Sequence, residues 1–440
     1  QGKPADSGGV LSMVLLIVPS LVKAPRALVR VAVGRGSVID AVALVAGTTV
    51  GGGFLALPQV AAPLGFAPTA LTLVGSWAFL YAEALVVAEC VARVRKQGKA
   101  EVSVASIASA TGGRRAALGA TALFGLLGTA TAASQLSKAA TLLISPSAGL
   151  LAYRCRALAV GLGVAFIASA NLRFVLAINT VLSLCFAGSA AWLAAAGIAE
   201  LAVTPVVVTA SNWGAARAAL PTVLQLLVFA ETVPTVSRAL DHDPARIRLV
   251  LFLGSLIPLC LEVGWAWLGL KLAGASMRDP IDVMLALPRC ALPLRVLAFS
   301  AIGTTLIGTF VEYQQGYWPI PKRPLKPCSL KSAGTLVALR GLAEDNNSQR
   351  RNPLKTAVMG IAPALCVSLT SPKAFFAAVE FAGAYPVALL WGLAPPLAAL
   401  RLRRRTDGER TAGPDFLLFG LLFLSSIFLA STVKADLSKI

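Results

Sequence analysis

Long apolar runs separated by short polar segments make up most of this chain. The apolar windows are about 20 residues long, and each could cross a bilayer core of roughly 30 Å. Eleven segments are predicted as helices: residues 37–60, 66–92, 116–145, 157–170, 174–200, 219–240, 248–272, 295–317, 354–371, 374–400 and 415–433. The pattern therefore predicts an all-α membrane protein that crosses the bilayer many times.

Composition supports a membrane location. Apolar residues make up 57 % of the chain and charged residues 13 %, whereas a soluble domain carries about 25 % charged residues. The net charge of +19 could indicate nucleic-acid binding. However, the basic residues lie almost entirely in the gaps between apolar windows, with no basic stripe along a helix. We therefore expect the lipid bilayer, and not a nucleic acid, as the partner.

The segments outside the apolar windows divide the chain into a tail, a membrane domain and a short end. Residues 1–36 form a basic amino-terminal tail, residues 37–433 the membrane domain, and residues 434–440 a carboxyl-terminal tail. Between residues 7 and 39 there is no acidic residue but several basic ones, which is typical of a transit peptide and equally of a basic tail on the inner side. The polar stretch 318–353 is predicted to be a flexible loop.

The residues needed for most enzyme sites are missing. The seven cysteines are scattered without a CxxC pair, and His242 is the only histidine. We expect the cysteines to be buried small apolar residues, and we expect no metal site and no cofactor. The chain also lacks GxxxxGK[ST], GxSxG and GxGxxG motifs, which argues against nucleotide-dependent and hydrolytic enzymes.

The first apolar segment contains the most informative motif, AGTTVGGGFLALP at residues 46–58. Its four glycines are poor helix formers, each costing about 1 kcal/mol relative to alanine. A helix broken here would direct the N–H groups of its second half toward the bilayer midplane, where they could bind a carboxylate. The alternative is close helix packing through Gly47 and Gly51.

These residues resemble the opening of the tryptophan/tyrosine permease family. The resemblance covers roughly residues 36–433 and rests on the glycine motif, on Gly65-Phe66, on ALVVAE at 84–89, on GSLIPL at 254–259 and on FF at 375–376 with FAG at 381–383. The segment from Val233-Pro234 to residues 240–243 looks closest to plant and algal members. That branch, together with the basic tail, suggests a plastid envelope location, with the plasma membrane as the alternative.

The resemblance implies a leucine-transporter-like fold within the amino acid/polyamine transporter superfamily. In that fold two inverted five-helix repeats, here about 37–200 and 219–400, are followed by one extra helix. The first and sixth helices are then broken, and the substrate binds between them. The family resemblance also implies uptake of aromatic amino acids, usually driven by protons. The implied substrate-binding residues are, from the first helix, Gly47, Thr48, Thr49, Gly51, Gly52 and Gly53, and from the sixth, Phe229, Ala230, Glu231 and Thr232.

The sixth segment supports a second break and also departs from the family. Pro234 removes an intrahelical hydrogen bond, so a kink is expected there. Where bacterial members have glycine, an aromatic residue, histidine and glycine, this chain has Val228 to Glu231. The loss of the glycine and histidine weakens the expectation of an aromatic substrate. A charged Glu231 would cost roughly 2.5–3.5 kcal/mol at a helix centre. It could carry the coupling proton, bind the substrate ammonium, or lie at the mouth of a wet cavity.

Other polar residues within the apolar windows are weaker candidates. Lys138 could snorkel, pair with an acid, or stand in for a coupling cation. Ser300, Thr304 and Thr305 lie where related folds bind sodium, with Thr304 taken as a coupling candidate, although such hydroxyls also bond the preceding helical turn. Glu89 is expected in a structural ion pair with the basic inner loop. Glu83, Glu262 and Glu380 could each be pore or interface residues.

Taken together, the residues and the resemblance predict a secondary transporter of amino acids coupled to protons. Phe229 would pack the substrate side chain, and Glu231 would handle the ammonium or the proton. The alternatives are the same fold carrying another small solute, such as an auxin-like acid, and a membrane sensor that binds an amino acid without moving it. An enzyme is not expected.

The distribution of basic residues predicts the topology. If the amino terminus is inside, 28 of the 39 lysines and arginines fall in inside segments and 10 in outside segments. The amino terminus and the 318–353 loop should then share one side, with the carboxyl terminus opposite. Labelling of single cysteines introduced near both termini, in sealed vesicles, measures this. Termini on the same side would contradict the odd number of spans.

Overall fold

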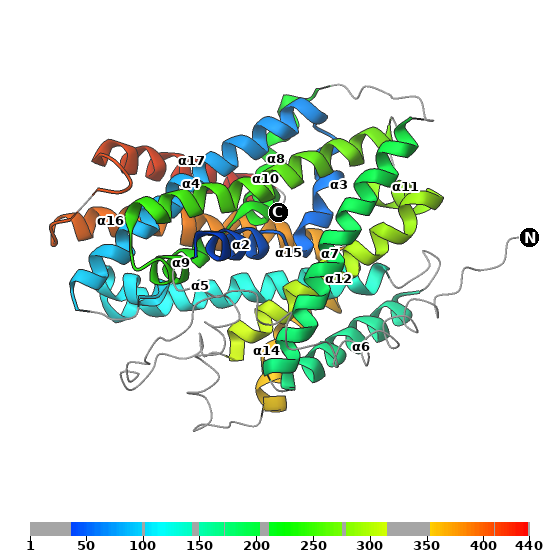
Figure 1. Cartoon of the computed structure of the whole chain (residues 1–440), viewed down its shortest axis with the longest axis horizontal. Coiled ribbons are helices and arrows are strands. Elements are labelled where there is room, and N and C mark those ends of the chain that lie inside the picture. The colour runs from blue at the N-terminus through cyan, green and yellow to red at the C-terminus, as the bar shows by residue number, and fades with distance from the viewer. Residues whose placement is uncertain are drawn as a thin grey trace, which may run out of the picture.

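A computed structural model describes residues 37–98, 102–142, 149–170, 172–202, 211–274, 279–314, 353–408 and 410–438 (Figure 1). All regular elements within these ranges are helices, which confirms the predicted all-α class. The tail at 1–36 and almost all of the 318–353 loop lie outside the described residues.

Nine stretches of the described chain are long and apolar enough to cross a membrane. They are α4 (Phe66–Lys96), α5 (Val104–Leu142), α6 (Leu150–Ser169), α7 (Leu172–Leu201), α8 (Ala216–Leu227) with α9 (Val233–Ala239), α10 (Pro244–Ala273), α12 (Pro288–Gln314), α15 (Ala374–Ala382) with η6 (Gly383–Leu393) and α16 (Ala394–Arg403), and α17 (Asp415–Leu437). The pair formed by α2 (Val38–Thr49) with η2 (Gly52–Ala56) and α3 (Leu57–Ala61) makes a tenth span, bent by 43°.

Each of the eleven predicted segments is helical, and most boundaries agree with the prediction to within a few residues. The largest difference is in the third segment, where α5 begins at Val104 because two helices meet across Gly113, whose φ is 71°. The ninth segment, α14 (Pro353–Ser368), has only 16 described residues, which is short for a helix that must cross the bilayer core. The structure therefore supports nine or ten of the eleven predicted spans.

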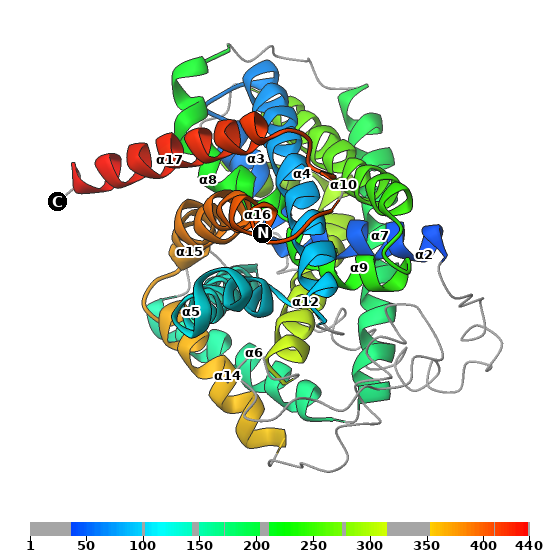
Figure 2. The same ribbon diagram turned by 90° about the vertical axis from the view of Figure 1, so that its left-hand side faces the viewer.

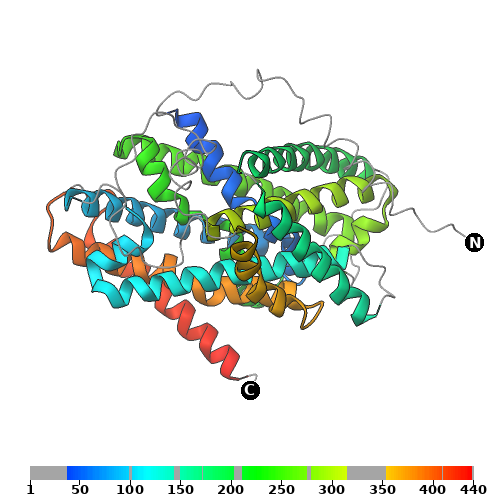
Figure 3. The same ribbon diagram turned by 90° about the horizontal axis from the view of Figure 1, so that it is seen from below.

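The long helices pack side by side, and one lies apart from the rest. Helix α10 contacts α2 and α4, α5 contacts α14 and α15, and α7 contacts α12. Helix α17 lies at the edge of the bundle and extends away from it (Figures 2 and 3). It buries only Leu418 and Ser425, so most of its apolar surface is available to lipid.

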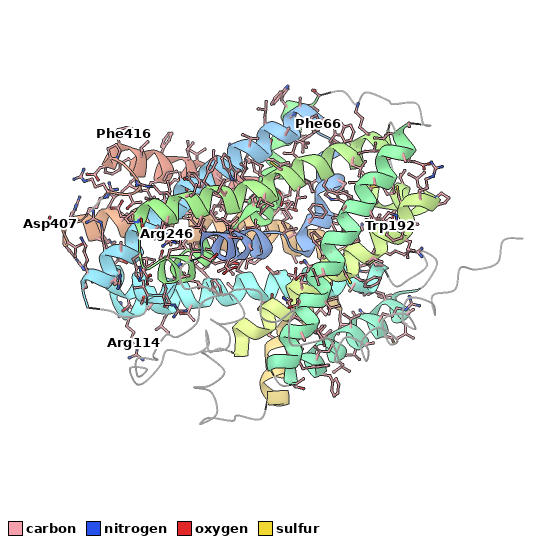
Figure 4. All side chains as sticks on the ribbon, viewed as in Figure 1. Phe66, Arg114, Trp192, Arg246, Asp407 and Phe416 are labelled. Atoms are coloured by element: carbon pink, nitrogen blue, oxygen red, sulfur yellow. The ribbon has the colours of Figure 1, made fainter. Side chains whose placement is uncertain are left out.

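The labelled residues in Figure 4 separate the two ends of the bundle. Arg114, Arg246 and Asp407 lie toward one end, and Phe66 and Trp192 lie toward the other. The first three belong to the gaps after the second, sixth and tenth predicted segments, which the distribution of basic residues places inside. Their shared end supports this part of the predicted topology.

A buried ion-pair network joins three helices at this end of the bundle. Glu89 of α4 accepts hydrogen bonds from Arg93 Nε at 2.9 Å and from Arg403 Nη2 at 2.7 Å. The Ala412 N–H also donates to Glu89 at 3.1 Å, and Arg403 Nη1 donates to Asp415 of α17 at 2.6 Å. The expected structural ion pair of Glu89 is confirmed, and it ties α4 to α16 and to the start of α17.

The expectation that the cysteines are buried is only partly correct. Cys90 and Cys290 are buried, whereas Cys155, Cys185, Cys260 and Cys366 are exposed. The exposed four lie on the outer faces of membrane-spanning or apolar helices, where lipid can solvate a thiol as well as a protein core can. All six of these cysteines are free, and Cys328 lies outside the described residues.

The Glu89 network generates a stability prediction. Glu89→Ala leaves the buried Arg93 and Arg403 charges without a partner, so we expect the free energy of unfolding to fall by about 3–5 kcal/mol. Arg289→Ala is the matched control, because Arg289 is largely exposed and its pair with Glu200 is 3.6 Å long. That change should cost about 0–1 kcal/mol. Denaturation of both variants in one detergent measures the difference; equal losses would contradict the structural role of Glu89.

Candidate binding site at two helix breaks

The first helix breaks at its glycines, as predicted. Helix α2 ends at Thr49, Val50 is extended, and η2 begins at Gly52. The Gly52 N–H donates a hydrogen bond of 2.8 Å to Thr305 Oγ1 of α12. A backbone group released by the break thus finds its partner on a neighbouring helix, as the bilayer interior requires.

Three helices approach the broken segment closely enough to exclude a side chain. A Cβ atom on Gly51 would lie 2.9 Å from Thr305 Oγ1, and one on Gly53 would lie 2.8 Å from Leu226 Cδ2 of α8. A Cβ atom on Gly52 would lie 1.8 Å from Gln135 Oε1 of α5. The glycines therefore allow these three helices to approach the break closely.

The earlier residues of the motif lie on α2, before the break. Gly47 and Thr48 are exposed on α2, and no described atom lies within 4 Å of a Cβ built on Gly47. Close packing through Gly47 is therefore wrong. The hydroxyls of Thr48 and Thr49 donate to carbonyls one turn back on α2, at 2.9 Å to Leu44 and at 2.7 Å to Val45. Of the predicted first-helix residues, the structure places Gly51, Gly52 and Gly53 at the break and the buried Thr49 directly before it, at the end of α2.

A second break lies in the sixth predicted segment, but not where Pro234 suggested. Helix α8 ends at Leu227, Val228 is extended, and Phe229 has φ −142° and ψ −2°. The short η4 (Ala230–Thr232) follows, and Pro234 then occupies the first turn of α9. A proline there loses no intrahelical hydrogen bond. The prediction of a break is confirmed, and its assignment to a kink at Pro234 is wrong.

The four predicted residues of the sixth helix lie at or next to this break. Phe229 and Ala230 are buried, and the Phe229 carbonyl accepts hydrogen bonds from the N–H of Thr232 at 3.0 Å and from its hydroxyl at 2.8 Å. Glu231 is half-buried and makes no hydrogen bond or ion pair with any described residue. Glu231 is thus a carboxyl group beside the break whose binding capacity is unused.

The halves of the two broken helices pack in opposite directions. Helix α3, which follows the first break, contacts α8, which precedes the second; α2, which precedes the first break, contacts η4, which follows the second (Figures 1 and 2). Each break leads through a 3₁₀ segment into a helix with proline in its first turn, Pro58 or Pro234. The two breaks are therefore alike in local structure and antiparallel in space.

Helix α5 bridges the two breaks with polar groups that the sequence analysis did not single out. Gln135 lies against Gly52, and one turn earlier Thr131 Oγ1 accepts a hydrogen bond of 3.3 Å from Gln225 Nε2 of α8. Gln225 precedes the second break by three residues. The sequence did contain a signal for this contact, because Gln135 and Gln225 are polar residues inside apolar windows. The candidates taken from the sequence were charged residues and hydroxyls in these windows, and uncharged amides were not among them.

Helix α10 contacts both halves of the first broken helix. A Cβ atom on Gly254 would lie 2.6 Å from Val45 Cβ of α2, and one on Gly269 would lie 2.9 Å from Pro58 Cβ of α3. Between these points Trp265 Nε1 donates to the Phe54 carbonyl at 3.0 Å, and the two rings stack with centroids 4.9 Å apart. Glu262, one turn before Trp265 on the same face, is only 1 % exposed.

Most of the remaining polar candidates make hydrogen bonds within their own helix or have no polar contact at the breaks. The hydroxyls of Ser300, Thr304 and Thr305 each donate to a carbonyl in the preceding turn, which confirms that alternative. Thr305 additionally accepts from Gly52, so it, and not Thr304, reaches the break. Glu83 is fully buried with neither carboxylate oxygen bonded within the described structure, whereas Glu380 is exposed.

Lys138 is buried beside two aromatic rings. Its Nζ lies 5.1 Å from the centre of the Phe375 ring and 5.7 Å from that of Phe376, within cation–π range. Asp279 and Asp282 act on the Lys138 charge from a longer distance. Burial raises the pKa of Asp279, and the Ile281 N–H and the Lys138 charge oppose that rise. The surroundings of Lys138 are therefore two aromatic rings and two more distant acids, one helical turn along α5 from Gln135.

Comparison with known proteins identifies the family of the chain. The model of the tryptophan/tyrosine permease family matches residues 35–275, which include both breaks, α5 and all of α10. A search of curated proteins finds no match to the chain. The family consists of transporters rather than enzymes, and the apolar helices fit a multi-pass membrane protein. With more than half of its residues matched, the chain belongs to the tryptophan/tyrosine permease family of amino-acid transporters.

Proposed function

We propose that this protein is a proton-coupled symporter of aromatic or large neutral amino acids that works by alternating access. The observation that carries the proposal is the pair of antiparallel helix breaks joined by α5. Breaks of this kind in membrane helices line ligand cavities, because exposed backbone groups need partners there. The acid-free basic segment 7–39 supports placing the transporter in a plastid envelope, which a fluorescent fusion of the full-length product would test.

The proposed fold has two inverted five-helix repeats, at about 37–200 and 219–400, followed by α17. The opposite packing of α3 with α8 and of α2 with η4 supports this arrangement, because an inverted repeat reverses the chain direction of equivalent halves. The similar 3₁₀ segments and prolines after each break also support it. The two repeats would rock about the site between the breaks.

The substrate carboxylate is assigned to the backbone of the first break. The first N–H groups of a helix lack partners within that helix and lie at the positive end of its dipole. Thr305 already binds the N–H of Gly52, so Gly51 and Gly53 are the donors left for a carboxylate. Because Gly52 has no side chain, the Gln135 amide can lie against it, and the backbone of the break stays accessible to a substrate.

Glu231 is assigned the coupling proton. Its carboxyl group is half-buried, beside the second break, and uses none of its hydrogen-bonding capacity within the described structure. An unpaired carboxylate is costly in such surroundings, so the neutral, protonated form suits the step in which the site crosses the membrane.

One prediction from the proposed site concerns Gly52. In Gly52→Val the side chain displaces the carboxamide of Gln135, which is flexible, so insertion should survive while the break is distorted. We expect the initial uptake rate to fall at least about tenfold, since a hydrogen bond to a charged group is worth about 1.5–3 kcal/mol. Gly75→Val in α4 is the control, because Gly75 is exposed with no described atom within 4 Å of its Cβ position. Near-normal uptake by the Gly52 variant would contradict the carboxylate assignment.

Another prediction concerns Glu231. Glu231→Gln mimics the protonated carboxyl group and cannot titrate, so it should keep substrate exchange and lose accumulation driven by a pH gradient. Both activities are measured in proteoliposomes with radiolabelled amino acids, with and without an acid exterior. Accumulation by the glutamine variant would remove Glu231 as the coupling site. Loss of exchange as well would indicate that Glu231 binds the substrate itself.

A further inference from the structure

The side-chain amide of Gln135 has an orientation set by its neighbours. Gln135 is 1 % exposed, and its Nε2 lies 3.0 Å from Ser134 Oγ. The Ser134 hydroxyl donates its only proton to the Thr131 carbonyl at 2.7 Å. The group that bonds Ser134 Oγ must therefore be a donor, which is the amide nitrogen. The amide oxygen of Gln135 is thereby directed toward Gly52.

That oxygen is an unused acceptor at the first break. Gln135 Oε1 is buried and has no hydrogen-bond partner within the described structure. It is the atom nearest to the Cβ position of Gly52, at 1.8 Å. Buried acceptors are almost always bonded in native proteins, so an orphan of this kind calls for a partner.

A second unused acceptor lies at the other break. Gln225 Oε1 is also buried without a partner in the described chain, while Gln225 Nε2 is held by Thr131 Oγ1. The next residue, Leu226, approaches Gly53. Thr131 and Gln135 occupy successive turns of α5, so α5 and its partner on α8 place two amide oxygens beside the two breaks.

We propose that Gln135 and Gln225 accept hydrogen bonds from the α-ammonium of the substrate and thereby select solutes that carry an amine. An ammonium group has three donors and no acceptor, and two amide oxygens supply two of its bonds. Gln135 lies against Gly52, whose neighbours Gly51 and Gly53 are assigned to the carboxylate, so the adjacent charged groups of one amino acid reach both. This inference rests on the proposed function and leaves Glu231 free for the proton.

Paired ligands test the assignment in the full-length protein. L-tryptophan and indole-3-propionate share a ring and a carboxylate and differ in the amine, and L-leucine and 4-methylpentanoate form a second pair. Equilibrium binding of all four is measured in one detergent. The unaltered protein should bind each amino acid more tightly than its des-amino partner. Gln135→Leu should weaken amino-acid binding about 10- to 100-fold and leave the des-amino acids unchanged.

Two further variants keep the test decisive. Gln225→Leu should act in the same direction and carries the test if Gln135→Leu does not fold. Gln59→Leu on α3 is the matched control, because Gln59 is exposed, and it should leave all four affinities unchanged.

The outcomes separate this inference from the proposed function. If a site variant binds both members of a pair more weakly by the same factor, the residue has a structural role and the ammonium assignment is overturned. If neither site variant weakens the binding of the amino acids, the assignment is also overturned. An unaltered protein that binds the des-amino acids as tightly as the amino acids also overturns it, while the carboxylate assignment stands. An unaltered protein that binds none of the four rejects the proposed substrate class itself.

Discussion

The hydrogen bond from the Gly52 N–H to Thr305 Oγ1 is the contact on which the arrangement of the centre depends. An interrupted helix in a bilayer exposes backbone groups that lipid cannot satisfy. Thr305 supplies a partner from α12 while its own proton goes to the Ala301 carbonyl. The first helix can therefore change direction by 43° within the described structure, and three other helices can approach its glycines.

Much of this architecture could be predicted from the sequence, because apolar length and glycine content act locally. The eleven helical segments, the break at the glycine motif and the ion pair of Glu89 all followed from residue type and position. The break in the sixth segment was expected for the wrong reason. Pro234 is the residue that usually disrupts a helix, yet here it begins one, because the chain is already interrupted at Phe229.

The parts that could not be predicted depend on contacts between segments distant in the chain. A glutamine in an apolar window gives no sign of which backbone it will face, so Gln135 and Gln225 became candidates only once α5 was placed against Gly52 and against α8. The choice between Thr304 and Thr305 also depended on such a contact. Both hydroxyls donate to the Ala301 carbonyl, but only that of Thr305 accepts a hydrogen bond from Gly52. For the cysteines, an apolar window did not distinguish a face toward protein from a face toward lipid.

The two glycine contacts of α10 have a mechanical consequence. At 1.5 Å per residue, Gly254 and Gly269 are about 22 Å apart along one continuous helix, and they contact α2 and α3 respectively. Helix α10 therefore spans the break in the first helix and contacts the helical segments on both sides of it. At both contacts α10 contributes a glycine and therefore no side chain. Between them, the Trp265 indole donates a hydrogen bond to the Phe54 carbonyl. The half of the first helix beyond the break is therefore fixed to α10 by a side-chain hydrogen bond, whereas at Gly254 the half before the break meets only backbone of α10.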